Sequence, residues 1–127
     1  MRVYLPMKRS ELSDFLQKRK FNATTLIAPT LLVAQEYGVS ELEEIEYAAL
    51  EIARTKSEND KLHIITTFEL PEALLNQVSE IEVGILLGSF ILNQNDLVAI
   101  YRVTSADEEL EWYDASEVDT ILEVVGD

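Results

Sequence analysis

Residues 40–70, SELEEIEYAALEIARTKSENDKLHIITTFEL, contain the change of hydrophobic period that decides the fold class. Between residues 45 and 53 the apolar side chains recur at i, i+3, i+4, i+7 and i+8, which is the spacing of an amphipathic helix. From residue 61 to residue 70 alternate positions are apolar, which is the period of a β-strand. The centre of the chain therefore predicts a helix followed by a strand.

The ends of this helix are also predicted from local chemistry. Ser40 and Glu43 have the spacing of a capping box, in which a hydroxyl and a carboxylate each accept an otherwise unpaired main-chain N–H. Arg54 and Lys56 are cations near the expected C-terminal end, where they complement the helix dipole.

The segments on either side extend the pattern. Upstream we expect a strand over residues 3–6, a helix from Ser10 to the basic run at 18–20, a short strand over 26–28 and a helix from Pro29 to Gly38. Downstream we expect a short helix over 71–77, strands over 81–87, 97–104 and 110–113, and a last helix that begins near Asp114. The run over 81–87 is apolar on nearly both faces and predicts a central strand.

These elements define an α+β fold. We expect a mixed, mostly antiparallel sheet of about five strands, with the helices packed mainly on one face. The chain has 127 residues, 47% of them hydrophobic, which suits a single domain over residues 1–127.

Charge and composition exclude several classes of function. Residues 1–37 carry six basic and three acidic side chains, residues 81–127 carry one basic and eleven acidic ones, and the net charge is −14. Because nucleic acid and anionic membranes repel such a chain, we expect neither as a partner. No signal peptide or membrane-spanning run is apparent and cysteine is absent, so we expect a cytoplasmic protein.

Residues with catalytic or ligand-binding chemistry do not form a known motif. His63 is the only histidine, and no cysteine or spaced carboxylates accompany it. Gly84 and Gly88 match neither a phosphate loop nor a dinucleotide fingerprint, and the acidic clusters at 41–46 and 107–111 lack the pattern of a calcium loop. We therefore predict no cofactor and no metal, and assign no catalytic residue. The run Lys18-Arg19-Lys20 predicts favourable contact with a helix C-terminus, with a phosphate-binding patch as the alternative.

The aromatic run Trp112-Tyr113-Asp114 allows two interpretations. In the structural one, Trp112 is a buried anchor and Asp114 caps the last helix, in a capping box with Glu117. In the functional one, Tyr113 and its acidic neighbours form a recognition surface, since aromatic residues are enriched at binding hot spots. The candidate interaction surface comprises Glu46, Tyr47, Tyr113 and Asp114.

Three classes of function remain. The sequence favours a non-catalytic protein-interaction or regulatory module that binds a protein partner or forms a homo-oligomer. A dimer would pair the basic first third with the acidic last third of a second copy. The alternatives are a small enzyme that uses the carboxylates of Glu46 and Asp114, with or without a divalent metal, and an acidic mimic of nucleic acid.

Three segments also carry a resemblance. Residues 1–6 (MRVYLP), 46–50 (EYAAL) and 112–114 (WYD) resemble a family of short uncharacterised actinobacterial proteins, a domain of unknown function. The resemblance spans nearly the whole chain and implies a bacterial cytosolic protein of one domain. It implies no activity, cofactor or partner.

Overall fold

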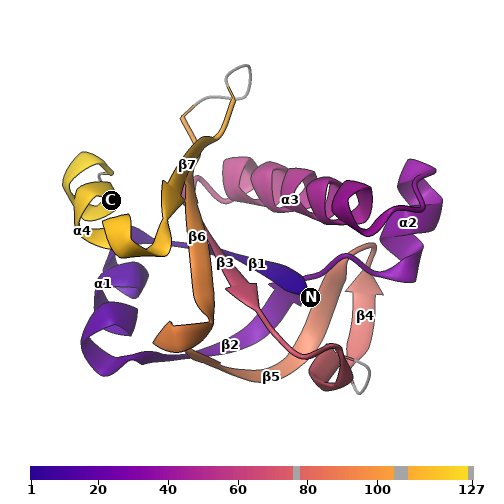
Figure 1. Cartoon of the computed structure of the whole chain (residues 1–127), viewed down its shortest axis with the longest axis horizontal. Helices are drawn as coiled ribbons and strands as arrows, with labels where there is room; N and C mark the ends of the chain where they lie inside the picture. The colour runs from indigo at the N-terminus through magenta and orange to yellow at the C-terminus, as the bar shows by residue number, and fades with distance from the viewer. Residues whose placement is uncertain (76–77, 105–108, 126–127) are drawn as a thin grey trace.

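Strands and helices alternate in the first half of the chain, and strands dominate the second half (Figure 1). The computed structural model describes residues 1–75, 78–104 and 109–125. Within these residues the elements are β1 (Arg2–Met7), α1 (Arg9–Lys18), β2 (Lys20–Ile27), α2 (Leu31–Tyr37), α3 (Leu42–Asn59), β3 (Ile64–Glu69), β4 (Ser79–Glu82), β5 (Ile85–Asn93), β6 (Leu97–Arg102), β7 (Glu111–Asp114) and α4 (Val118–Val124). Short 3₁₀ helices occupy Glu72–Leu75, Gln94–Asp96 and Ala115–Glu117.

The strands form one sheet in the order β4-β5-β2-β1-β3-β6-β7. Each of these neighbouring pairs is antiparallel, so the sheet that we expected to be mixed contains no parallel pair among the described residues. The central strand β1 pairs with β3 along its whole length, from Arg2↔Glu69 to Met7↔Ile64. The α+β class and the antiparallel character are therefore confirmed, but the described sheet has seven strands instead of about five.

A hairpin accounts for part of the higher strand count. The apolar run over 81–87, which predicts one central strand, turns back at Val83–Gly84 and contributes to both the edge strand β4 and its neighbour β5. Gly84 adopts φ +81°, which glycine accepts without a Cβ clash. The Glu80 carboxylate stabilises the turn, because its Oε2 accepts hydrogen bonds from the Gly84 N–H (2.7 Å) and the Thr30 hydroxyl (2.6 Å).

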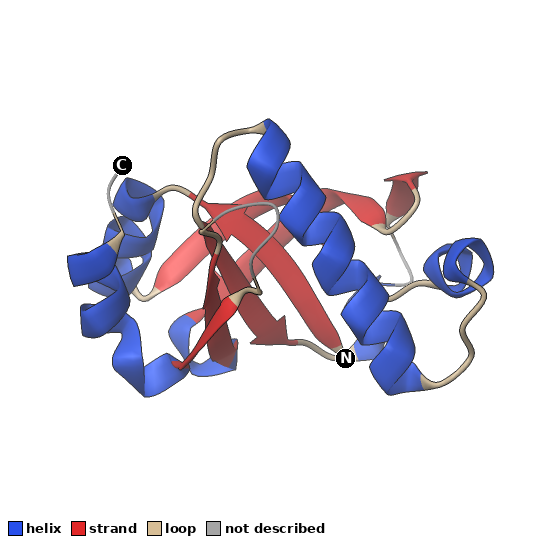
Figure 2. Cartoon of the chain, turned by 90° about the horizontal axis from the view of Figure 1, so that it is seen from above, coloured by secondary structure: helices blue, strands red, loops and turns tan. Residues whose placement is uncertain are grey.

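Helices cover both faces of the sheet, which corrects the prediction that they pack mainly on one. On one face α3 packs Ala49 and Ala53 against Tyr4 and Ile65. The other face carries the larger cluster, whose members from the helices are Leu12, Phe15 and Ile121. Figure 2 shows α3 lying across the sheet, and Figure 1 shows α1 and α4 together away from it. Strand β3 is buried on both sides, and only its last residue is exposed.

The predicted helix ends have mixed outcomes. Gly38 ends α2 with φ +65°, as expected, and Asp114 and Glu117 form the predicted capping box. The capping box at Ser40 is wrong, because α3 begins one residue later with Glu41 as its N-cap and no side-chain capping bond there. None of the described helices has the length and apolar character that crossing a membrane requires.

Trp112 is 57% exposed, so its expected role as a buried anchor is wrong. Strand β7 is the edge of the sheet, and successive side chains of a strand point to opposite faces. Tyr113 points to the face of the larger core cluster and packs against it, which leaves Trp112 on the opposite face.

Candidate functional site

Glu46 and Tyr47 are neighbours on α3 with different environments. The Glu46 side chain is half-buried, and its Oε2 accepts the main-chain N–H of Arg2 at 3.1 Å. This bond ties the helix to the beginning of β1. Tyr47 is 65% exposed and is therefore available for contact with a partner.

Tyr113 and Asp114 lie on β7 and have structural roles. Tyr113 is half-buried against the larger core cluster. The Asp114 Oδ2 accepts the Ser116 hydroxyl at 2.6 Å and the Ser116 N–H at 3.0 Å. The Ser116 hydroxyl and then the Ser116 N–H stabilise the carboxylate, which lowers the pKa of Asp114 from its ordinary value.

The carboxylate chemistry suggested for Glu46 and Asp114 finds no support in this geometry. A general acid at neutral pH needs a raised pKa, whereas the pKa of Asp114 is lowered. The Glu46 carboxylate already accepts a hydrogen bond from the main-chain N–H of Arg2. Within the described part of the chain, no three side chains of His, Cys, Asp or Glu gather as a metal-binding group. His63 is exposed, and its Nδ1 lies 3.4 Å from the Val103 carbonyl oxygen.

The α2–α3 groove is a surface cavity of about 380 Å³ between these two helices. Its lining residues are Tyr37, Val39, Glu43, Glu44, Tyr47, Ala48 and Glu51. Tyr37 and Tyr47 provide exposed aromatic rings, and the three glutamates provide negative charge beside them. The groove thus combines an apolar surface with acidic side chains.

The same two helices carry other exposed apolar side chains. Leu31, Leu32 and Tyr37 on α2, and Leu42 on α3, join Tyr47 among the exposed large hydrophobic residues. Sequence reasoning missed all four, although a signal was present for Leu31 and Leu32. Residues 31–34 are four consecutive apolar residues in a short helix, and such a helix cannot bury them all on one side.

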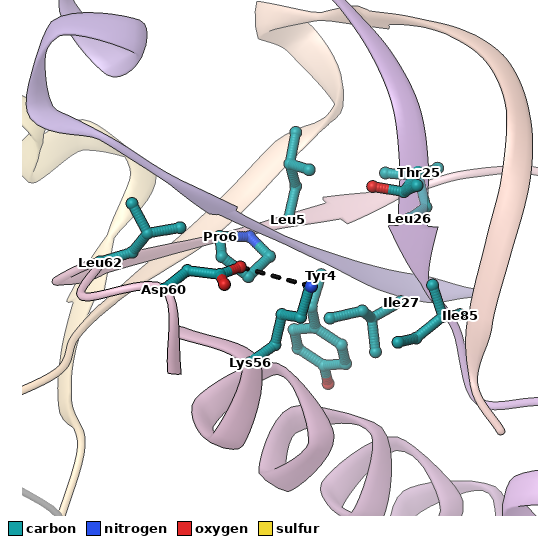
Figure 3. A pocket seen from close by; sticks show the side chains of 10 residues that line it. All are labelled: Tyr4, Leu5, Pro6, Thr25, Leu26, Ile27, Lys56, Asp60, Leu62 and Ile85. Carbon is teal, nitrogen blue, oxygen red and sulfur yellow. Dashed lines mark ion pairs between the residues drawn. The ribbon is translucent and has the colours of Figure 1, made fainter. Parts of the chain in front are cut away.

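A smaller cavity of about 110 Å³ lies where β1 and β2 diverge, beside the end of α3 (Figure 3). The described pairing of β1 with β2 is at Tyr4↔Ile27, and Pro6 lacks the N–H that would continue a ladder. Figure 3 shows the Lys56 and Asp60 side chains pointing toward each other beside Pro6, with Nζ and Oδ2 3.4 Å apart.

This smaller cavity offers little reactive chemistry. Burial raises the pKa of Tyr4, and the negative charge of Glu46 raises it further. The phenol therefore stays protonated at neutral pH and is unsuited to act as a base. The Lys56 ammonium is paired with Asp60. We interpret the cavity as a consequence of the proline in a central strand.

Fold and surface together define an α+β protein with an antiparallel sheet and an exposed apolar groove between two helices. The chain belongs to a family of unknown function, DUF6912, whose model matches residues 1–66. No curated protein and no solved structure matches the chain. The match confirms membership of a family of unknown function, and an actinobacterial origin stays a prediction. It spans β1 to α3 and so includes every residue that lines the α2–α3 groove.

Proposed function

We propose that this chain is a non-catalytic module that binds a protein partner through the α2–α3 groove. The observation that carries the proposal is the groove itself, in which two exposed tyrosines, Tyr37 of α2 and Tyr47 of α3, share one lining. Soluble proteins rarely leave a contiguous apolar surface open unless it serves an interaction. Tyr47, one of the residues predicted for the interaction surface, lines the groove.

The charges of the groove specify the chemistry of the partner. Glu43, Glu44 and Glu51 place three carboxylates around the two tyrosines. Opposite charges across an interface speed association and select the correct partner. We therefore infer a partner segment with an apolar side chain that inserts between Tyr37 and Tyr47 and with lysine or arginine residues beside it.

A photo-crosslinking amino acid at position 47 tests this proposal in the native host. We expect a discrete crosslinked protein, and we expect Tyr37→Ser to abolish it because Tyr37 lines the groove together with Tyr47. A crosslinker at position 91 is the matched control, since Ile91 is 63% exposed and lies on β5. Identical products from both positions, or none from position 47, would contradict the proposal.

Sedimentation of the purified chain distinguishes a foreign partner from a second copy. A dimer that Tyr47→Ser dissociates, while Ile91→Ser leaves it intact, would identify the partner as a second copy that uses this groove. A monomer that still crosslinks to another protein would support a separate partner. A dimer that both variants leave intact would place self-association on another surface.

A further inference from the structure

A cavity of about 190 Å³ lies at the beginning of α1, away from the α2–α3 groove. Its lining residues are Lys8, Arg9, Ser10, Asp60, Lys61, Leu62, His63 and Val125. They carry three formal positive charges and one negative charge, in a chain whose net charge is −14. The local excess of positive charge is therefore opposite to that of the molecule as a whole.

The sheet brings these residues together from distant parts of the chain. Strands β1 and β3 are antiparallel, and Met7 pairs with Ile64. The segment that follows β1 therefore lies beside the segment that precedes β3. This places Lys8 and Arg9 next to Lys61 and His63.

No ion pair within residues 1–75, 78–104 and 109–125 neutralises the cations of this cavity. Among the described residues, Lys8, Arg9 and Lys61 form no ion pair. The Arg9 Nε donates to the Leu122 carbonyl oxygen at 2.8 Å, which fixes the guanidinium while its terminal nitrogens have no partner within the described chain. The single carboxylate, Asp60, is paired with Lys56 on α3.

Lys61 occupies a position that normally favours glycine. It adopts φ +58° directly after α3, where the Leu62 N–H donates to the Ser57 carbonyl (2.7 Å) and the Lys61 N–H to the Glu58 carbonyl (3.3 Å). These two bonds form a Schellman motif, in which this residue is usually glycine because the left-handed backbone strains other side chains. Arg19 at the end of α1 also has a positive φ (+62°), so the strain alone does not identify a functional residue, and what distinguishes Lys61 is its place in the lining of the cavity.

We propose that this cavity binds the phosphate group of a small phosphorylated molecule. A phosphate carries up to two negative charges and several acceptor oxygens, which match two ammonium groups, one guanidinium and the Ser10 hydroxyl. The acidic remainder of the protein repels long polyanions, whereas charges beyond about 8 Å are screened at physiological salt and do not exclude a small anion.

Titration with inorganic phosphate at constant ionic strength, followed by NMR, tests the proposal. His63 is the only histidine, so its imidazole signals report on this cavity alone. We expect saturable shifts with phosphate and none with acetate. The double variant Lys8→Gln/Lys61→Gln should weaken binding about tenfold or more, because both charges lie at the site. The matched control Lys18→Gln/Lys20→Gln removes the same charge from exposed lysines outside the cavity.

A second variant separates binding from folding. Lys61→Gly should raise the melting temperature, because it relieves the left-handed strain, and should weaken phosphate binding at the same time. Shifts that do not saturate, that acetate reproduces or that both lysine pairs affect equally would indicate an adventitious ion only and would overturn the proposal. Unchanged phosphate affinity in Lys61→Gly would overturn the role of Lys61.

Discussion

At the scale of single residues, Gly38 and Gly84 both have positive φ but differ in their surroundings. A Cβ built on Gly84 would lie 2.9 Å from Val33 Cγ2 and 3.0 Å from Ile52 Cδ1, whereas one on Gly38 would meet nothing within 4 Å. Gly84 therefore serves both the hairpin turn and the packing of β4 and β5 against α2 and α3.

Alanine substitutions separate these two contributions. We expect Gly84→Ala to lower the free energy of unfolding by roughly 2–3 kcal/mol, from backbone strain plus steric overlap. Gly38→Ala should cost roughly 1 kcal/mol, from backbone strain alone. Urea denaturation of the two variants measures the difference. Equal losses would show that Val33 and Ile52 move aside without cost.

Ionisation of the Tyr4 phenol makes the free energy of unfolding depend on pH in the alkaline range. Burial raises its pKa above the ordinary value of about 10, so the unfolded chain loses the phenol proton first. The protonated Tyr4 phenol makes its full contribution to the free energy of unfolding below pH ~10. At higher pH this contribution falls by up to about 1.4 kcal/mol per pH unit. We expect Tyr4→Phe to flatten this decline in denaturation midpoints measured from pH 9 to pH 11.5. Tyr47→Phe, at an exposed site, is the control, and an equal effect of both would contradict the assignment.

At the scale of elements, the junction of β7 and α4 depends on the Asp114 cap. Hydrogen bonds from Ser116 lower the pKa of Asp114 in the folded protein. These bonds therefore stabilise the folded state at pH values above the ordinary pKa of an aspartate, and the stabilisation is lost as the pH falls through the lower pKa of folded Asp114. We expect Ser116→Ala to reduce the melting temperature near pH 7 and to have little effect near pH 2.

Ser40→Ala is the matched control for this cap, because Ser40 is an exposed serine near a helix start where no side-chain capping bond is found. Melting temperatures of both variants across this pH range make the comparison. A loss in Ser116→Ala that is the same at every pH would contradict a role for the charged carboxylate.

The elements also show what local patterns predict. The helix that ends at Gly38 and the cap at Asp114 follow from chemistry within one turn, and both were predicted. The hairpin at Gly84 was missed, because a continuous apolar run is compatible with one buried strand or with two strands joined by a turn. The prediction that Trp112 is buried was wrong for a similar reason. Local sequence does not show which face of an edge strand is turned towards the core until the neighbouring elements are known.

At the scale of the whole molecule, self-repulsion accompanies the net charge of −14. The more exposed ion pairs of the described residues, such as Arg102–Glu111 at 2.9 Å, contribute little individually. Added salt should therefore weaken the repulsion between the acidic side chains more than it weakens the attraction within the ion pairs.

We expect the melting temperature to rise when sodium chloride is increased from about 20 to about 200 mM, since the Debye length shortens to below ~10 Å. A gain of 1 kcal/mol would appear as an increase of roughly 2–8 °C. Glu123→Lys, at an exposed position on α4, should reduce the salt dependence. A melting temperature that falls with salt would show that the ion pairs dominate.

The sequence by itself determined the α+β class, the antiparallel character of the sheet, the C-terminal end of α2 at Gly38 and the beginning of the last helical segment at Asp114. The beginning of α2 was predicted at Pro29, but Thr30 is its N-cap. Hydrophobic period and capping act over a few residues, so they can be recognised locally. Tertiary structure decided which apolar residues stay exposed in the α2–α3 groove, and it placed helices on both faces of the sheet. It also brought Lys8 and Arg9 beside Lys61, because pairing of β1 with β3 joins segments more than fifty residues apart. A charge cluster assembled by strand register cannot be recognised until the register is known.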